Sequence, residues 1–431
     1  MAETAGRTVK VLVTWRGERL GTVGPFPVES PWWAEVGPVA ERLESVLGVP
    51  ALVLRLHSVV GGEDARGGLV TYHAEALRRP GEVLGADDGE RLDGDPLRAE
   101  WATPDGLRSA LDWAGRELTR LGRPVAGPVR QVKSWNLSGL IRLPTAAGPV
   151  WLKTTPRFAV AEAEVIAAFA VVDPGLVPAV LAADGRRMLL DHVPGEDCWG
   201  VPDDAMLAVV GRWAAAQARL AGGPAVPGLP DRSPGVLAGR FRALLASGAV
   251  NELGAGELAA AYRLADALPA LTARLAACGL PVTVVHGDFH PGNWRFDGRR
   301  TVAVDFSDAH LGHPAVDGLR PRAFLPPARW AEVRRAWVRA WSELLPGSDP
   351  AGALVVAEPL MHLSYAVRYQ EFLDGIEPSE RIYHAGDPAS EVRAALASVG
   401  GGSVNGTRTT GTGAGGRAGA GAGFGGEPLE A

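Results

Sequence analysis

The stretch LPVTVVHGDFHPGNWRF, residues 280–296, followed by TVAVDF at 301–306, decides the fold. Its first apolar run predicts a buried strand that leads into His286-Gly287-Asp288, and TVAVDF predicts a second strand that ends in Asp305. We expect these two strand ends to bring Asp288, Asn293 and Asp305 close together.

Two carboxylates and one amide in this order are typical of phosphoryl transfer from a nucleotide. That reaction needs one carboxylate beside the attacking hydroxyl and oxygen ligands for Mg²⁺. Asp288 and Asn293 have the D-x-x-x-x-N spacing of a kinase catalytic loop, and Asp305-Phe306-Ser307 stands where D-F-G is expected. The pattern predicts Asp288 as the catalytic residue, Asn293 and Asp305 as Mg²⁺ ligands, and a nucleotide as the phosphoryl donor.

A kinase also needs a cation on the phosphates, and the sequence offers Lys153 in the short β-type run GPVWLKTT, 148–155. The next segment, FAVAEAEVIAAFAVV, predicts a helix on which Glu162 shares the apolar, inward face, while Glu164 lies off it. We therefore expect Glu162 to pair with Lys153. A solvated lysine and a glutamate that is favoured only by the helix dipole stay open as alternatives.

The residues expected to contact the nucleotide before and after Lys153 do not follow a standard motif. No G-x-G-x-x-G precedes Lys153, so Ser138 and neighbouring backbone amides are expected to cradle the phosphates. A strand at 186–197 ends in a Pro-Gly turn, where the backbone of Asp191, His192 and Val193 is expected to bond adenine in a connector between two lobes. An ordinary strand end is the alternative.

Composition separates four regions of the 431 residues, and the globular region at 124–399 is expected to contain two lobes. The pattern strand, strand, helix, strand, strand predicts a small accessory α/β domain, and a Gly-, Asp- and Pro-rich linker with one helix follows it. The last region is so rich in glycine that it is expected to be a disordered tail. The predicted regions are 1–78 (accessory α/β domain), 79–123 (linker and helix), 124–194 (nucleotide-binding lobe), 195–399 (catalytic and substrate-binding lobe) and 400–431 (tail).

The charge balance of 43 Lys+Arg against 49 Asp+Glu gives a net charge of −6, so neither nucleic acid nor an anionic membrane is indicated as a partner. The two cysteines, Cys198 and Cys278, and a start without a long apolar run predict a cytoplasmic protein. The oligomeric state is not indicated.

The motifs H-G-D-F-H-P-G-N at 286–293 and V-D-F-S-D-A-H-L-G-H-P-A-V-D at 304–317 resemble those of the aminoglycoside phosphotransferase and choline kinase-like family. The resemblance extends over about 124–396 and implies an α+β protein with a two-lobed protein-kinase-like fold. It also implies ATP, Mg²⁺ and a hydroxyl acceptor on a small molecule, with the roles given above for Asp288, Asn293, Asp305, Lys153 and Glu162. A structural role is expected for Asp317.

The acceptor site is expected in the helical stretch 329–396, where Glu371, Asp374, Glu377 and Glu380 gather. Carboxylates near a helix C-terminus are opposed by the dipole, so Glu371 and Asp374 predict an amine-bearing acceptor such as an aminoglycoside or amino sugar. A solvated acidic face is the alternative. Two other function classes stay open: a catalytically weak nucleotide-binding sensor or scaffold, and a metal-dependent hydrolase that uses His286, His290, His310 and His313.

Overall fold

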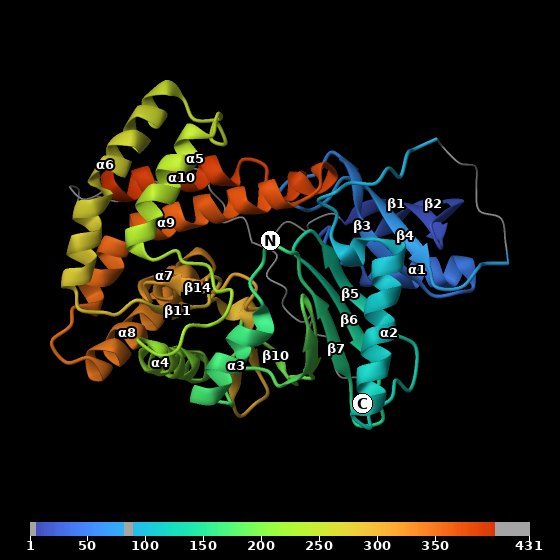
Figure 1. The fold of residues 1–431 in the computed structure, drawn as a ribbon, viewed down its shortest axis with the longest axis horizontal. Helices are drawn as coiled ribbons and strands as arrows, with labels where there is room; N and C mark the ends of the chain where they lie inside the picture. The colour runs from blue at the N-terminus through green and yellow to red at the C-terminus, as the bar shows by residue number, and fades with distance from the viewer. Residues whose placement is uncertain (1–5, 82–88, 401–431) are drawn as a thin grey trace. The chain divides into compact units, whose positions relative to one another are not determined.

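The computed structural model describes residues 6–81 and 89–400, and these form two compact units (Figure 1). The first unit contains the described residues up to Ala159 together with Val180–His192 and Gly375–Tyr383. The second contains Val160–Ala179, Val193–Asp374 and the described residues from His384 onward. Except for Gly400, the predicted tail lies outside the described residues.

The accessory α/β region of the first unit has the predicted order of elements. Its four-stranded sheet has the strand order β2-β1-β4-β3, in which β1 runs parallel to β4 and the other pairs are antiparallel. The pattern of apolar residues predicted the order of these elements along the chain, whereas the pairing of the strands comes from the structure. The elements are β1 (Arg7–Trp15), β2 (Glu18–Val28), α1 (Gly37–Leu47), β3 (Ala51–Val60) and β4 (Leu69–Ala76).

The first unit also contains a five-stranded antiparallel sheet and the helix predicted between the two regions. Thr103 caps that helix, because its Oγ1 accepts a hydrogen bond from Gly106 N at 3.1 Å, and Pro104 supplies a preset first turn. The sheet order is β5-β6-β7-β9-β8. The elements are η1 (Glu100–Ala102), α2 (Pro104–Arg120), β5 (Arg130–Trp135), β6 (Ser138–Leu143), β7 (Val150–Thr154), β8 (Val180–Asp184) and β9 (Arg187–Asp191).

One hydrophobic core joins the two sheets of the first unit through α2. Leu52 and Leu54 of β3 belong to the same buried cluster as Leu107 of α2 and Leu152 of β7. Figure 1 shows α2 lying along the five-stranded sheet. The side-chain amide of Gln131 also exchanges two 2.7 Å hydrogen bonds with the backbone of Val53. The accessory region therefore shares a core with the β5–β9 sheet.

The second unit is mainly helical, with five short strands that hold the loops of the predicted catalytic motifs. β11 pairs with β14, and β12 lies between β10 and β13. The helices are α3 (Glu162–Val172), α4 (Asp203–Leu220), α5 (Pro234–Ala246), α6 (Ala255–Ala277), α7 (Ala315–Leu319), α8 (Pro327–Leu344), α9 (Pro350–Gly375) and α10 (Asp387–Gly400). The strands are β10 (Glu196–Asp197), β11 (Thr283–Val285), β12 (Trp294–Phe296), β13 (Thr301–Ala303) and β14 (His310–Gly312). Three short 3₁₀ helices complete the described elements: η2 (Pro291–Asn293), η3 (Arg320–Ala323) and, within the first unit, η4 (Pro378–Tyr383).

A stack of aromatic rings forms the core beneath the catalytic loop. The Trp213 ring stacks on Phe169 at 4.3 Å and on Phe289 at 4.8 Å, measured between ring centroids, and all three side chains are buried. Such stacks add to the free energy of burial and fix the rings in place. None of the helices in the described part of the chain is long and apolar enough to cross a membrane.

Candidate active site

The buried carboxylate of Asp317 holds the loop after β11 in place. Asp317, at the start of α7, accepts hydrogen bonds from His286 N at 2.8 Å and from Gly287 N at 3.0 Å. Its Oδ2 also accepts from the side chains of Trp213 and Gln217, both at 2.9 Å. These four donors fit the structural role that was expected for Asp317.

Gly287 is required at its place in this loop. Its φ of +83° lies in the left-handed region, and a Cβ there would come within 2.3 Å of the Asp308 carbonyl oxygen. The tight turn at Gly287 lets the chain leave the buried strand and bring Asp288 to the end of the loop.

Asp288 is held between a guanidinium and an imidazole. Arg320 Nε donates to Asp288 Oδ1 at 2.7 Å, and His290 Nε2 lies 3.3 Å from Oδ2. Burial alone favours the neutral acid, but the charge of Arg320 and the contact with His290 outweigh it and hold the pKa of Asp288 far below its ordinary value. Asp288 is therefore a carboxylate over the whole physiological pH range.

Asn293 lies directly beside Asp288. Its Nδ2 donates to the Asp288 carbonyl at 2.9 Å and to Oδ2 at 3.2 Å, which fixes the orientation of the amide. The side chain is 0% exposed, and within the described residues its Oδ1 has no hydrogen-bond partner. A buried oxygen without a donor is costly unless a ligand satisfies it, so this atom fits a hard cation such as Mg²⁺.

Asp305 follows Val304, whose N donates to the Asn293 carbonyl at 2.9 Å, so the backbone segments that carry Asn293 and Asp305 are adjacent. The φ of Asp305, +66°, is rare for a residue with a side chain, and Ser307 Oγ donates to its Oδ1 at 2.9 Å. Strain of this kind persists only where the surrounding structure enforces it. The structure thus places the Asn293 side chain against Asp288, and Asp305 directly after the backbone contact between Val304 and Asn293; its part in a metal site stays a prediction.

Glu162 is buried at the start of α3, on the inward face that was predicted, whereas Glu164 is exposed. Its Oε1 accepts a 2.8 Å hydrogen bond from Phe306 N, the residue after Asp305. Glu162 therefore anchors the backbone of the predicted metal-binding segment. Its ion pair with Lys153 stays a prediction, because Lys153 belongs to the first unit and Glu162 to the second.

The predicted nucleotide contacts lie on the β5–β9 sheet. Lys153 is buried on β7, and Ser138 Oγ accepts a 3.1 Å hydrogen bond from Trp135 Nε1. In the turn between β5 and β6, Asn136 is buried, and neither polar atom of its side chain has a partner in the described part of the chain. Sequence reasoning missed Asn136, although it lies in the stretch that was expected to cradle the phosphates.

The predicted connector lies where the chain passes from one unit to the other. Asp191 and His192 end the β5–β9 sheet in the first unit, and Val193 begins the next part of the second. Asp191 Oδ1 accepts two 3.0 Å hydrogen bonds from Arg123, and Trp151 Nε1 donates to His192 Nδ1 at 3.1 Å. Side-chain contacts thus order this connector, while an adenine contact stays a prediction.

The four carboxylates expected to gather near the acceptor do not form one group, because Glu371 is paired with arginines and Glu377 and Glu380 belong to the first unit. Glu371 accepts from Arg232 at 2.5 Å and from Arg240 at 3.0 Å, so its charge is already neutralised. Glu377 and Glu380 follow the end of α9 and belong to the first unit, where Glu377 binds Arg98 at 2.8 Å and Arg55 at 3.5 Å. Asp374 is exposed and accepts from Gln370 at 2.7 Å.

Two further residues near Asp288 were missed. Arg320 is separated from Asp288 by 32 positions, and no local pattern marks it. Trp199 is 45% exposed, and its ring stacks on His290 at 5.6 Å, so an apolar surface lies beside the catalytic loop. An exposed tryptophan is unusual in a chain whose tryptophans are mostly core residues, but exposure is not visible in the sequence.

Comparison with known proteins identifies the family. The solved structures that resemble this chain include a putative fructosamine-3-kinase from Thermobifida fusca (20% identity, 66% of this chain and 98% of that one, TM-score 0.46). They also include a choline/ethanolamine kinase family protein from Mesorhizobium loti (18% identity, 67% and 99%, TM-score 0.46). No curated protein matches. The model of the phosphotransferase enzyme family matches residues 117–354, which agrees with the resemblance and the protein-kinase-like fold inferred from the motifs. Because this match covers more than half of the chain and contains all three residues of the Asp288 site, the chain belongs to the phosphotransferase enzyme family.

Proposed function

We propose that this phosphotransferase uses ATP and Mg²⁺ to phosphorylate a hydroxyl group of a small molecule. The observation that carries the proposal is the buried, unpartnered Oδ1 of Asn293, whose amide is oriented by Asp288 in the segment that also holds Asp305. An ionised carboxylate beside oxygen ligands for a hard cation is the arrangement that phosphoryl transfer requires.

Each residue has a separate task in this proposal. Asp288 accepts the hydrogen bond of the acceptor hydroxyl and directs that oxygen for attack, and Arg320 keeps the carboxylate ionised and in place. Asn293 and Asp305 would hold Mg²⁺, which when bound neutralises charge on the phosphate oxygens. Glu162 fixes the backbone beside Asp305.

The nucleotide side rests on the β5–β9 sheet and the connector. Lys153 supplies a cation for the phosphates, and Ser138 with the amide of Asn136 supplies hydrogen-bond partners for their oxygens. The backbone of Asp191 to Val193 is proposed to bond adenine. The buried, unpaired thiols of Cys198 and Cys278 support a reducing, cytoplasmic environment for this reaction.

The acceptor is the least constrained part of the proposal. An aminoglycoside or amino sugar would need a free carboxylate for its amine, and with Glu371 neutralised this role falls to Asp374. The exposed face of Trp199 offers a second contact, since aromatic faces attract both sugar C–H groups and cations.

The hydrolase alternative loses support from the histidines. His286 Nε2 contacts the Val304 carbonyl at 3.0 Å, and His310 Nδ1 contacts the Asp308 carbonyl at 2.9 Å. Within the described ranges, no three His, Cys, Asp or Glu side chains are grouped as metal ligands. A measurement of ATP turnover distinguishes the nucleotide-binding sensor from the kinase.

The test is phosphate transfer by the purified full chain. ATP turnover is measured with Mg²⁺ against aminoglycosides, amino sugars, choline analogues and nucleosides, in the wild type and in Asp288→Asn. We expect acceptor-dependent turnover that falls by about 100-fold or more in Asp288→Asn. The exposed Asp266→Asn variant is the matched control and should retain full activity. Nucleotide binding without turnover for any acceptor would favour the sensor.

A further inference from the structure

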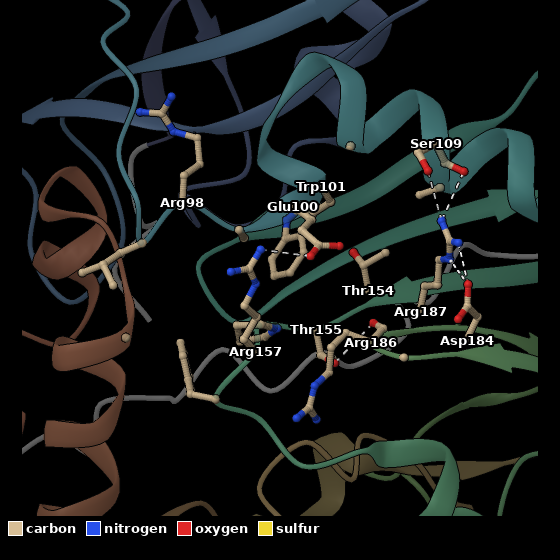
Figure 2. A pocket seen from close by; sticks show the side chains of 18 of the residues that line it. Arg98, Glu100, Trp101, Ser109, Thr154, Thr155, Arg157, Asp184, Arg186 and Arg187 are labelled. Carbon is tan, nitrogen blue, oxygen red and sulfur yellow. Dashed lines mark hydrogen bonds and ion pairs between the residues drawn. The ribbon is translucent and has the colours of Figure 1, made fainter.

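The first unit contains a cavity that the proposed reaction does not use. It has a volume of about 540 Å³ and is formed entirely by residues of that unit (Figure 2). Three segments and Gly375 surround it: the chain from Pro96 through η1 to the start of α2, the end of β7 with the loop that follows, and the turn between β8 and β9. Pockets of a few hundred cubic ångströms are the size that small ligands occupy.

This cavity lies on the reverse side of the strand that carries Lys153. Thr154 and Thr155 line it, whereas Lys153 does not. Adjacent residues of a strand point to opposite faces of the sheet, so a ligand beside Thr154 is separated by the sheet from a nucleotide beside Lys153. The cavity is therefore a distinct candidate binding site.

Positive charge around the cavity exceeds negative charge. Four arginines line it, against two carboxylates: Arg98, Arg157, Arg186 and Arg187, with Glu100 and Asp184. Arg98 is neutralised by the buried Glu377, which is outside the lining, and Arg187 is bound by Asp184 at 2.5 Å.

Arg186 and Arg157 are the two cations with spare binding capacity. Arg186 donates to the carbonyl of Ala159, and no carboxylate of the described residues pairs with it. It is partly buried, and this desolvation lowers its pKa. Arg157 contacts Glu100 at 3.2 Å, but the two side chains are 80% and 73% exposed. An ion pair that exposed is worth about 1 kcal/mol or less, so a ligand can replace Glu100.

The rest of the lining suits the apolar body of a ligand. Trp101 and Phe158 contribute rings, and Thr154 contributes a hydroxyl group. Figure 2 shows Arg157 directed toward Glu100 and Arg187 held between Ser109 and Asp184, while the guanidinium of Arg186 lies apart from both pairs.

We propose that this cavity binds a small phosphomonoester, with its phosphate on Arg186 and Arg157 and its apolar body against Trp101 and Phe158. A phosphate dianion offers several acceptors to planar guanidinium groups, and with Arg98 neutralised by Glu377 the rest of the lining still has one positive charge in excess. The site is independent of the proposed use of ATP.

The test is isothermal titration of the full chain with phenyl phosphate. Inorganic phosphate and phenol serve as the probes that have only the anion or only the ring. We expect one site that binds phenyl phosphate at least about fivefold more tightly than inorganic phosphate, with no detectable binding of phenol. Equal affinity for inorganic phosphate, or binding of phenol alone, overturns the phosphomonoester assignment.

Variants locate the site. Arg186→Gln and Arg157→Gln should each weaken phenyl phosphate binding about tenfold or more, and Arg186→Lys should weaken it less than Arg186→Gln does. Arg116→Gln, on the exposed face of α2 and outside the lining, is the matched control for charge. Lys153→Ala should leave binding unchanged. Binding that is lost in Lys153→Ala and kept in Arg186→Gln overturns the proposal, and melting curves verify that each variant is folded.

Discussion

Replacing Arg320 with Met tests whether this arginine sets the ionisation of Asp288, the proposed catalytic carboxylate. Arg320 and Asp288 are bonded at 2.7 Å, and their side chains are only 10% and 14% exposed. The guanidinium also lies 4.8 Å from the centroid of the Phe324 ring and 4.7 Å from that of Tyr365. Methionine retains most of this packing and removes the charge.

The expected loss of stability follows from the burial of this ion pair. Removing one partner of a buried ion pair costs about 3–5 kcal/mol of stability, because the other charge is left unpaired. In the wild type the pKa of Asp288 is lower in the folded state than in the unfolded state. Its ionised form therefore stabilises the fold, and this contribution is complete above about pH 4. The contribution is lost only when the pH falls through the folded-state pKa. In Arg320→Met, only the contacts with His290 and the Asn293 amide oppose the effect of burial, so the pKa of Asp288 rises and its stabilising contribution shrinks.

The assay is the pH dependence of phosphate transfer, measured from pH 5 to pH 9 with the melting temperature recorded in parallel. We expect a flat acidic limb in the wild type. In Arg320→Met the rate should fall toward low pH, by about tenfold for each unit below the new pKa. Arg322→Met, two residues along and with an exposed ion pair to Glu358, is the matched control and should keep the wild-type profile. A folded Arg320→Met protein with an unchanged profile would refute the argument.

Three further predictions concern other parts of the molecule. Asp305→Ala should raise the Mg²⁺ concentration needed for ATP binding more than Asn293→Ala does, because it removes a full charge. A Mg²⁺ titration of ATP binding measures this, and unchanged metal dependence in both variants would mean that the metal site lies elsewhere. Asp317→Asn should lower the melting temperature and the rate together, since an amide cannot accept all four hydrogen bonds, whereas loss of rate alone would indicate direct participation. Burial and the nearby Glu377 raise the pKa of Glu380 from 4.5 to about 8, so its stabilising contribution is complete below pH 4.5 and is lost as the pH rises through 8. Glu380→Gln should remove this pH-dependent loss of stability, which amounts to up to about 1.4 kcal/mol per pH unit. Melting temperatures are measured from pH 5 to pH 9, and the same pH dependence in the variant and the wild type would contradict the prediction.

The tertiary structure decided which carboxylates are left to bind a cationic acceptor. Glu371 and its partners Arg232 and Arg240 are separated by 139 and 131 positions, so the sequence shows a carboxylate but not its neutralisation. The placement of Glu377 and Glu380 in the first unit has the same origin, because the chain after α9 packs against β3, far away in sequence. The amine-bearing acceptor was inferred from local spacing, and local spacing does not report such contacts.

The sequence by itself determined the order and the chemistry of the catalytic loop. Asp288, Asn293 and Asp305 lie within 18 consecutive positions, after β11, in η2 and after β13, so the local pattern of strands and turns was enough to predict their order. Helix α2 was equally predictable, since Thr103 and Pro104 define its start locally. The pairing of Arg320 with Asp288 and the cavity beside Thr154 were decided only by the tertiary structure. Both depend on side chains that meet across many residues, and their positions are set by packing of the whole unit, which no local pattern encodes.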